Sequence, residues 1–453
     1  MASTYLSRTA GTSTENYKYT FSAWVKRTGI LGSSSVNEVL FSNWYDDNNS
    51  AYIRFEDIDD NLHVYDKYGS TIDLNYKTNM KFRDNNAWYH IVVNVDGTRS
   101  ANQRCKIYVN GSEVSCSSTT DTGGTLAMKT VTTTNAMRLG AINNTGGTEY
   151  YFSGLMSHVH YIDGTGYDAS AFGEYDANGV WKIKTDVSVT YGNNGFFILK
   201  DGNSVTDQSG NGNNFTVAGG TLTNTEDNPS NVFATLNPLD KAINGTLPTF
   251  AYGNTQWTAS GNSTSNNAVR GTLGNSNGKY YFEAKLLEAT NTMIGVHLTS
   301  VSPFYNGDGY MGNNSGFYGI YINGSDDISA RVAGSSGASG LGSVTNNDII
   351  GCAFDFDNNK FYFSKNGTWL NSGDPTSGAT GTGSFGTLAS GLYVPAITNV
   401  SWTTASSTAF NFGNGYFGTT AVASAGTNAS GNGIFEYDVP TGFTALSTKG
   451  LNL

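Results

Sequence analysis

The sequence predicts an all-β protein. Glycine is abundant at 56 residues while proline is rare at 7, and Asn, Ser and Thr are numerous. Together with 27 Tyr and 24 Phe, this composition is typical of short strands joined by tight turns. No window predicts an amphipathic helix of three turns. The best helical segment, residues 168–174, is a single turn that Asp168 would cap.

Residues 347–370 predict three strands joined by two tight turns. One turn centres on Asn358-Asn359 and the other on Asn366-Gly367, and Asn-Gly suits the positive φ angles of a two-residue hairpin turn. Two-residue loops at both turns would pair Phe356 with Phe361, Phe354 with Phe363, Phe363 with Leu370, and Asp357 with Lys360. We therefore expect one apolar face, and an opposite face that carries Asp355, Asp357, Lys360 and Tyr362.

This meander resembles the GD-x-IGC and YFSKNG-x-W core of SPRY domains, with Asn347-Asp348 in place of Gly-Asp. The preceding strands at residues 278–286, 294–298 and 316–325 and the later strands at 393–397 and 408–414 follow the SPRY order. The resemblance implies a sandwich of two antiparallel sheets.

Five earlier segments resemble the laminin-G-like, concanavalin-type lectin superfamily. They are YTFSAWVKRT at 19–28, AWYHIVVNVDGT at 87–98, CKIYVNGSEV at 105–114, AMRLGAIN at 136–143 and FSGLMSHVHYIDG at 152–164. The resemblance implies a jelly-roll sandwich. We therefore predict two antiparallel β-sandwich domains in tandem: a lectin-like domain at 1–190, an ordered connector with a few strands at 191–254, and a SPRY-like domain at 255–453.

The charge pattern excludes some classes of partner. The net charge is −11, and no cluster of Lys and Arg is present to neutralise phosphates, so we expect no nucleic acid binding. No apolar run approaches the ~20 residues that span a bilayer, so we expect no membrane insertion. The first residues lack the apolar region of a secretory signal, so we expect synthesis in the cytoplasm without export.

The cysteines leave two alternatives open. Cys105 and Cys116 flank the predicted turn at Asn110-Gly111, and a two-residue loop would place them opposite each other, with Cα atoms about 5.5 Å apart. A disulfide and a pair of buried thiols both fit this register, and a reducing cytoplasm favours the thiols. We expect Cys352 to be a core residue.

The sequence predicts no enzyme. Glycoside hydrolysis needs two carboxylates facing one cleft, but the acidic stretch at 56–60 has Ile58 where the spacing needs an acid. We interpret these residues as solvated loop or edge charges. His158 and His160 would share one strand face, yet a third metal ligand is missing, so we interpret both as structural. We interpret His90 as a packing residue.

One segment suggests a calcium site, and calcium is the only cofactor hypothesis. Asp207, Asn211 and Asn213 place oxygen-bearing side chains alternately around a glycine turn, which suits a hard cation. The alternative is a turn stabilised by Asn and Gly. A single acidic residue favours the turn.

Two loops have the composition of carbohydrate sites, which combine aromatic rings with amides and carboxylates. The first includes Trp44, Tyr45 and Asp46. The second includes Tyr305, Asp308 and Tyr310, and lies between SPRY strands. The alternative role for these aromatic residues is packing within the turns.

Tandem domains of these two kinds, in a chain low in charge and rich in Asn, Gly and Thr, resemble structural proteins of marine bacteriophages. The resemblance implies a virion surface protein, either a tail-fibre or appendage component or a capsid decoration. Its partners would be host-surface glycan or other virion proteins, and fibres often form trimers. The alternatives are a purely structural decoration protein without ligand and, less favoured, a glycan-cleaving enzyme.

Overall fold

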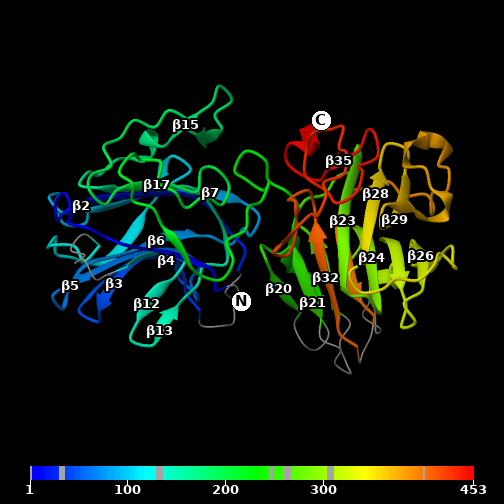
Figure 1. Ribbon diagram of the computed structural model, residues 1–453, viewed down its shortest axis with the longest axis horizontal. Coiled ribbons are helices and arrows are strands. Elements are labelled where there is room, and N and C mark those ends of the chain that lie inside the picture. Colours follow the sequence, from blue (N-terminus) through cyan, green and yellow to red (C-terminus); the bar gives the residue numbers. More distant parts are fainter. Residues whose placement is uncertain are drawn as a thin grey trace. The chain divides into compact units, whose positions relative to one another are not determined.

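The chain folds into two units built from strands, which confirms the predicted all-β class (Figure 1). The computed structural model describes residues 3–29, 36–128, 136–243, 248–259, 267–303, 311–400 and 404–452. One unit comprises Met1–Asn224 with Asn228–Ser230, and the other comprises Thr225–Asp227 with Asn231–Leu453. The helical segments are short 3₁₀ turns: η1 (Ala169–Ala171), η2 (Met311–Asn313), η3 (Leu370–Ser372), η4 (Pro375–Thr380) and η5 (Gly450–Asn452). No helix of the described part is both long and apolar enough to cross a membrane.

The first domain contains two antiparallel sheets. The strands of the eight-stranded sheet are, in spatial order, β10 (Cys116–Asp121), β6 (Thr71–Lys81), β5 (Asn61–Tyr68), β4 (Asn49–Phe55), β3 (Glu38–Asp46), β11 (Ala136–Leu139), β1 (Tyr5–Thr9) and β18 (Thr216–Gly219). Those of the six-stranded sheet are β17 (Phe196–Ile198), β14 (Gly154–Asp163), β2 (Lys18–Arg27), β7 (Trp88–Asp96), β8 (Cys105–Val109) and β9 (Ser112–Glu113). Two small hairpins join β12 (Ile142–Asn144) to β13 (Gly147–Glu149) and β15 (Gly173–Tyr175) to β16 (Trp181–Ile183).

The core of the first domain is formed by apolar side chains from both sheets. Phe41, Ile53 and Val64 come from the eight-stranded sheet, while Phe21 and Ile91 come from the six-stranded one. Because successive side chains of a strand point to opposite faces, the residues between these core positions point away from the core. The single predicted helical turn is confirmed as η1, where the Asp168 carboxylate accepts the Ser170 N–H at 3.0 Å.

The second domain also contains two large sheets. The strands of the first are, in order, β19 (Leu236–Ile243), β22 (Asn267–Gly271), β31 (Tyr393–Asn399), β24 (Thr292–Leu298), β25 (Phe317–Ile322), β26 (Ile328–Val332) and β27 (Ser335–Ser336). Those of the second are β20 (Thr249–Ala251), β21 (Gln256–Ala259), β32 (Ser406–Asn411), β23 (Lys279–Glu288), β28 (Ile349–Asp355), β29 (Lys360–Lys365) and β30 (Thr368–Trp369), with β35 (Thr444–Ala445) parallel to β23. A separate hairpin joins β33 (Tyr416–Phe417) to β34 (Thr420–Ala421).

Both predicted turns of the meander of β28, β29 and β30 form, but only one has the predicted length. At Asn366-Gly367 the loop has two residues, because Lys365 pairs with Thr368, as predicted. The other loop is longer, since Asp355 pairs with Lys360. The predicted two-residue turn at Asn358-Asn359 was therefore wrong. The cause is Asp355, whose carboxylate accepts the Asn358 N–H at 2.9 Å and closes a four-residue turn.

This longer turn moves the register by two residues. The pairs are Phe354 with Phe361, Cys352 with Phe363 and Asp355 with Lys360. The predicted pairing of Phe363 with Leu370 does not form either, because β30 ends at Trp369 and Leu370 begins η3. A shift of two residues leaves each side chain on its predicted face, so the phenylalanines still lie in the core.

The opposite face of the meander is buried at Asp355 and Tyr362, whereas Asp357 and Lys360 at the turn keep some exposure. Tyr362 is only 1% exposed and clusters with Phe435, Val439 and Phe443 of the C-terminal segment. This segment ends near β23, where β35 pairs with it (Figure 1). The chain after the last sheet strand therefore covers that face, which local strand patterning does not reveal.

Residues 191–254, predicted as a connector, are divided between the two units. β17 pairs with β14 and β18 pairs with β1, so this first part extends both sheets of the first domain. β19 pairs with β22 and β20 pairs with β21, so the later part extends both sheets of the second. The boundary between the units falls at residues 224–231.

The cysteines are free thiols. The hairpin register at Asn110-Gly111 is as predicted, since Val109 pairs with Ser112. Pairing in that sheet ends at Glu113, and Cys116 instead pairs with Thr78 in the eight-stranded sheet. The predicted position of Cys116 opposite Cys105 was therefore wrong. Cys352 is fully buried in the core of the second domain, as expected.

Candidate functional site

Aromatic and polar side chains cover the outward face of strands β3 to β6 in the first domain. On β4, Ala51, Ile53 and Phe55 point into the core, so Tyr52 and Arg54 point outward. We call this surface the polar-aromatic face. It consists of Trp44, Ser50, Tyr52, Arg54, His63, Tyr65, Lys67, Asn75 and Lys77.

A stacked pair of tyrosines lies at the centre of this face. Tyr52 on β4 and Tyr65 on β5 are cross-strand partners, and their ring centroids are 4.9 Å apart with an interplanar angle of 10°. The Arg54 guanidinium lies 4.2 Å from the centroid of the Tyr52 ring, which is a cation–π distance. The edge of His63 contacts both rings. These contacts hold two aromatic rings in a fixed orientation, with part of Tyr65 exposed.

One end of the face holds a polar network around Glu56. Its carboxylate lies 2.5 Å from His63 Nδ1, 2.9 Å from Arg54 Nη2 and 3.5 Å from Lys77 Nζ. The other ring nitrogen of His63 lies 2.8 Å from Asn75 Oδ1. Burial alone would raise the pKa of Glu56, but the His63 hydrogen bond and the Arg54 charge lower it to about 2. Glu56 is therefore a carboxylate at neutral pH.

Of the first predicted loop, only Trp44 lies on the face. Trp44 is half-buried and pairs with Ser50, which in turn pairs with Lys67. Tyr45 lies at an irregularity of the β3–β4 pairing and is 52% exposed. Asp46 closes the β3–β4 turn, since its carboxylate accepts the Asn48 N–H at 2.8 Å and the Asn49 side-chain amide at 2.9 Å. The structure thus separates the three residues.

The other predicted loop, with Tyr305, Asp308 and Tyr310, lies outside the described residues. Its role in binding stays a prediction.

The structure brings Asp207, Asn211 and Asn213 together in one hydrogen-bonded loop. The Asp207 carboxylate accepts the backbone N–H groups of Phe197 at 2.8 Å, Ser209 at 2.9 Å and Asn213 at 2.8 Å. The two asparagine amides donate to backbone carbonyl oxygens, among them that of Gly195. A calcium ion would have to replace these hydrogen bonds, and calcium binding here stays a prediction.

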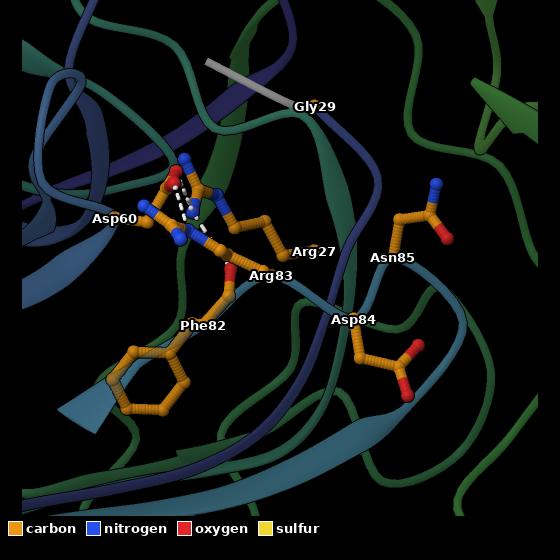
Figure 2. A pocket seen from close by; sticks show the side chains of 7 residues that line it. All are labelled: Arg27, Gly29, Asp60, Phe82, Arg83, Asp84 and Asn85. Carbon is orange, nitrogen blue, oxygen red and sulfur yellow. Dashed lines mark hydrogen bonds and ion pairs between the residues drawn. The ribbon is translucent and has the colours of Figure 1, made fainter. Parts of the chain in front are cut away.

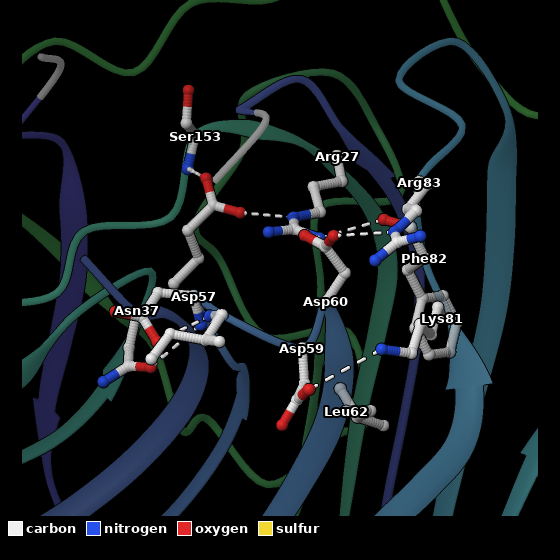
Figure 3. Close-up of polar contacts among 12 residues, drawn as sticks. Arg27, Asn37, Asp57, Asp59, Asp60, Leu62, Lys81, Phe82, Arg83 and Ser153 are labelled. Carbon is white, nitrogen blue, oxygen red and sulfur yellow. Dashed lines mark hydrogen bonds and ion pairs between the residues drawn. The ribbon is translucent and has the colours of Figure 1, made fainter. Parts of the chain in front are cut away.

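The acidic stretch at 56–60 contains one buried acid, so the interpretation as solvated charges was wrong for Asp60. Asp60 accepts from Arg27 Nη1 and Arg83 Nε, both at 2.9 Å (Figure 3). Arg27 also donates to Glu38 Oε2 at 2.6 Å, and both residues are only 2% exposed. The ion pairs explain the burial, because a charge is stable in the interior only when it is paired.

A small cavity lies beside this network, lined by Arg27, Gly29, Asp60, Phe82, Arg83, Asp84 and Asn85 (Figure 2). The cavity has a volume of about 10 Å³, which is room for one water. Arg27 Nη2 is buried there without a protein partner. A single water would satisfy this donor, so the cavity is too small to be a glycan site.

His90 and His160 are buried packing residues, in agreement with their interpretation from the sequence. His90 lies between Trp24 and Trp181, and its Nδ1 accepts the indole N–H of Trp181 at 2.9 Å. His160 stacks on Phe197 with centroids 3.9 Å apart. His158 does not alternate regularly with it, because the strand bulges at residues 157–160. No cluster of three or more His, Cys, Asp or Glu suited to a metal occurs in the described parts of the chain.

Sequence reasoning missed the tyrosine stack, although a signal for it was present. In residues 50–56, SAYIRFE, apolar Ala51, Ile53 and Phe55 alternate with larger polar or aromatic residues. This alternation predicts a strand with one outward face. Which strand pairs with it, and hence that Tyr65 lies opposite Tyr52, depends on the fold.

The comparisons with known proteins agree with this architecture. Residues 2–165 match the concanavalin A-like lectin/glucanases superfamily, and residues 279–413 match the SPRY domain. No curated protein matches the sequence. Among similar solved structures, the SPRY domain of human HERC1 has 15% identity and a TM-score of 0.30, and the match covers 39% of this chain and 96% of that one.

The TRIM65 PSpry domain has 12% identity and a TM-score of 0.28, with 39% of this chain and 91% of that chain covered. A Bacteroides ovatus protein to which carbohydrate binding is attributed has 18% identity and a TM-score of 0.34, with 50% and 59% covered. The two family matches lie in the two structural units. The chain therefore carries an N-terminal domain of the concanavalin A-like lectin/glucanases superfamily followed by a SPRY domain.

Proposed function

We propose that this protein binds glycan through the polar-aromatic face of its first domain. The observation that carries the proposal is the stacked pair of Tyr52 and Tyr65, held by Arg54 beside the polar side chains of His63 and Asn75. A half-exposed ring can pack against the apolar side of a sugar, while neighbouring polar groups bond its hydroxyls. The lectin-like fold of the domain fits such a binding function.

The face binds glycan in this proposal without cleaving it. Hydrolysis needs a second carboxylate and a general acid that is protonated at the working pH. Glu56 is the carboxylate bonded to His63 beside the tyrosines, and its pKa of about 2 makes it a poor proton donor. A glycan-cleaving enzyme would release reducing sugar from a bound polysaccharide.

The biological setting we propose is the surface of a bacteriophage virion, where the glycan belongs to the host surface and the second domain contacts another virion protein. Support for this setting is the tandem of a lectin-like and a SPRY domain in a chain of low charge. Imaging of labelled particles tests it. The protein should lie on a tail fibre, an appendage or the capsid shell, and its absence from purified particles would contradict the setting.

Binding to a glycan array tests the function itself. Tyr65→Ala and Trp44→Ala should each weaken binding to every glycan that the intact chain binds. An intact chain that binds no glycan on the array, yet is present on the particle, would instead indicate a purely structural decoration protein.

A further inference from the structure

We propose that the glycan bound by the polar-aromatic face is anionic and carries carboxylates on its sugar rings. This inference rests on the proposed function and names the class of ligand for the same face. Its basis is the distribution of charge around the tyrosine stack.

The three charged side chains of the polar-aromatic face are all cations, although the chain as a whole has a net charge of −11. Arg54, Lys67 and Lys77 lie on β4, β5 and β6, while the nearby acids are placed at the two ends of the face: Glu56 at one, and Asp46 and Asp47 of the β3–β4 turn at the other. Arg54 and Lys77 share the single charge of Glu56, at 2.9 Å and 3.5 Å. Two cations around one carboxylate leave positive charge for a ligand.

Lys67 lies at the other end of the stack. Its Nζ donates to the backbone carbonyl of Asp47 at 2.6 Å, so its contact in the turn is to a neutral group. Two acids, Asp46 and Asp47, lie in the same turn, and the Asp46 carboxylate already accepts two hydrogen bonds from Asn48 and Asn49. The ammonium of Lys67 can therefore still pair with a ligand carboxylate.

Lys67 and Lys77 lie on opposite sides of the Tyr65 ring, each about two residues away along the strand direction. Lys67 is two residues from Tyr65 on β5, while Lys77 pairs with His63, two residues from Tyr65 in the other direction. Two residues span about 7 Å along a strand. A sugar ring stacked on Tyr65 thus has a cation within reach on each side, as suits an oligosaccharide with a carboxylate on more than one ring.

Three cations do not make a nucleic acid site, which would need a longer array of Lys and Arg along a phosphate backbone. A neutral glycan would gain less from the lysines, because hydrogen bonds to hydroxyls offset less of their desolvation than a bond to a carboxylate does. The arrangement therefore favours a polyuronate type of ligand over both.

A matched pair of ligands tests the inference. Oligogalacturonides as free acids and as methyl esters share the same sugar rings and differ in charge. We expect the intact chain to bind the acid at least about five-fold more tightly than the ester at low salt, and the difference to shrink in high salt. Lys67→Gln and Lys77→Gln should each weaken acid binding about two- to five-fold and leave ester binding unchanged. Lys182→Gln, a 58%-exposed lysine on β16, is the control and should change neither.

The outcomes separate this inference from the proposed function. Equal affinity for acid and ester, with both lost in Tyr65→Ala, would overturn the anionic class and retain glycan binding. If neither oligogalacturonide binds, a glycan array with acidic and neutral sugars gives the answer. Selective binding of other carboxylated glycans would support the inference. Binding of neutral or sulfated glycans alone would overturn it. No binding to any glycan overturns the proposed function as well.

Discussion

The two domains share a two-sheet architecture but treat the outward faces of their eight-stranded sheets differently. In the first domain, Tyr52 and Tyr65 lie on a half-buried face lined by charged residues. In the second, Tyr281 and Tyr362 occupy an outward face that is fully buried beneath Phe435 and its neighbours in the C-terminal segment. Aromatic residues on a sheet thus form a candidate binding surface in one domain and a second core in the other. An aromatic sheet face becomes a second core where a later part of the chain packs on it, and it stays a surface where none does.

Removing an aromatic ring from the C-terminal segment should have the largest effect on this difference. Phe435 is 1% exposed, and its ring lies 5.0 Å from that of Tyr281. Phe435→Ala should lower the free energy of unfolding of the second domain by about 3–5 kcal/mol, measured by urea unfolding. Ile434→Ala is the control, since Ile434 is 37% exposed. An equal loss in both variants would contradict a specific anchoring role for Phe435.

A buried carboxylate also anchors the segment. Glu283 accepts the backbone N–H groups of Glu436 and Tyr437, both at 2.9 Å. Glu283→Ala leaves these donors buried without an acceptor, so we expect a loss of about 2–3 kcal/mol in the same unfolding experiment. Glu288→Ala, at an exposed site on the same strand, should change stability by less than about 0.5 kcal/mol.

The Asn-Gly hairpins offer a feature in which the two domains are alike. Asn110 and Asn366 both have φ of 48°, and their side-chain oxygens accept the N–H of His90 and Ile349, each at 2.8 Å. Asn110→Ala and Asn366→Ala should each cost about 2 kcal/mol, one part from the lost hydrogen bond and one from the left-handed backbone. Calorimetry that resolves two transitions would show each loss in its own domain. Unequal losses of unfolding free energy would contradict the expectation that the two asparagines play the same role in their turns.

Each domain contains one buried glutamate that should make its stability depend on pH. Burial raises the pKa of Glu38 in the first domain and of Glu283 in the second to about 7. A raised pKa means that the folded state binds the proton more tightly than the unfolded state does, so the protonated carboxyl stabilises the fold. This stabilisation is fully present below the pKa of the carboxyl in the unfolded state and is lost as pH rises through 7. Protonation of each carboxyl should therefore contribute stability as the pH falls from 8 to 5, by at most about 1.4 kcal/mol per pH unit. Buried histidines whose pKa is lowered, such as His90 and His297, oppose this contribution below pH 6.5. Glu283→Gln should remove the carboxyl contribution from the second transition alone, and a slope unchanged by that substitution would contradict the assignment.

Local patterns predicted much of the fold. The turn at Asn366-Gly367, the η1 cap at Asp168 and the phenylalanine core of the meander follow from the φ preferences of Asn-Gly, from side-chain capping and from strand alternation. Where a side chain changed the local geometry, prediction failed: Asp355 lengthens the turn at Asn358-Asn359 by accepting from Asn358.

The candidate site was less predictable, because it depends on contacts distant in sequence. Trp44 was identified from its loop composition, but the partnership of Tyr52 and Tyr65 follows from the pairing of β4 with β5. The polar face expected for the meander was buried by residues more than 70 positions later, such as Phe435 over Tyr362. Burial by a distant segment leaves no signal in the strand that it covers.

The most direct test of the account compares glycan binding by the intact chain with binding by two tyrosine variants. Tyr65→Ala removes the half-exposed ring of the stack, and Tyr252→Ala removes a tyrosine of the second domain that is 45% exposed. Affinities would be measured by calorimetry against the glycan that binds best on an array. We predict at least about ten-fold weaker binding for Tyr65→Ala, which is about 1.4 kcal/mol, and unchanged binding for Tyr252→Ala. Binding that survives in folded Tyr65→Ala would contradict the claim that the polar-aromatic face is the glycan site.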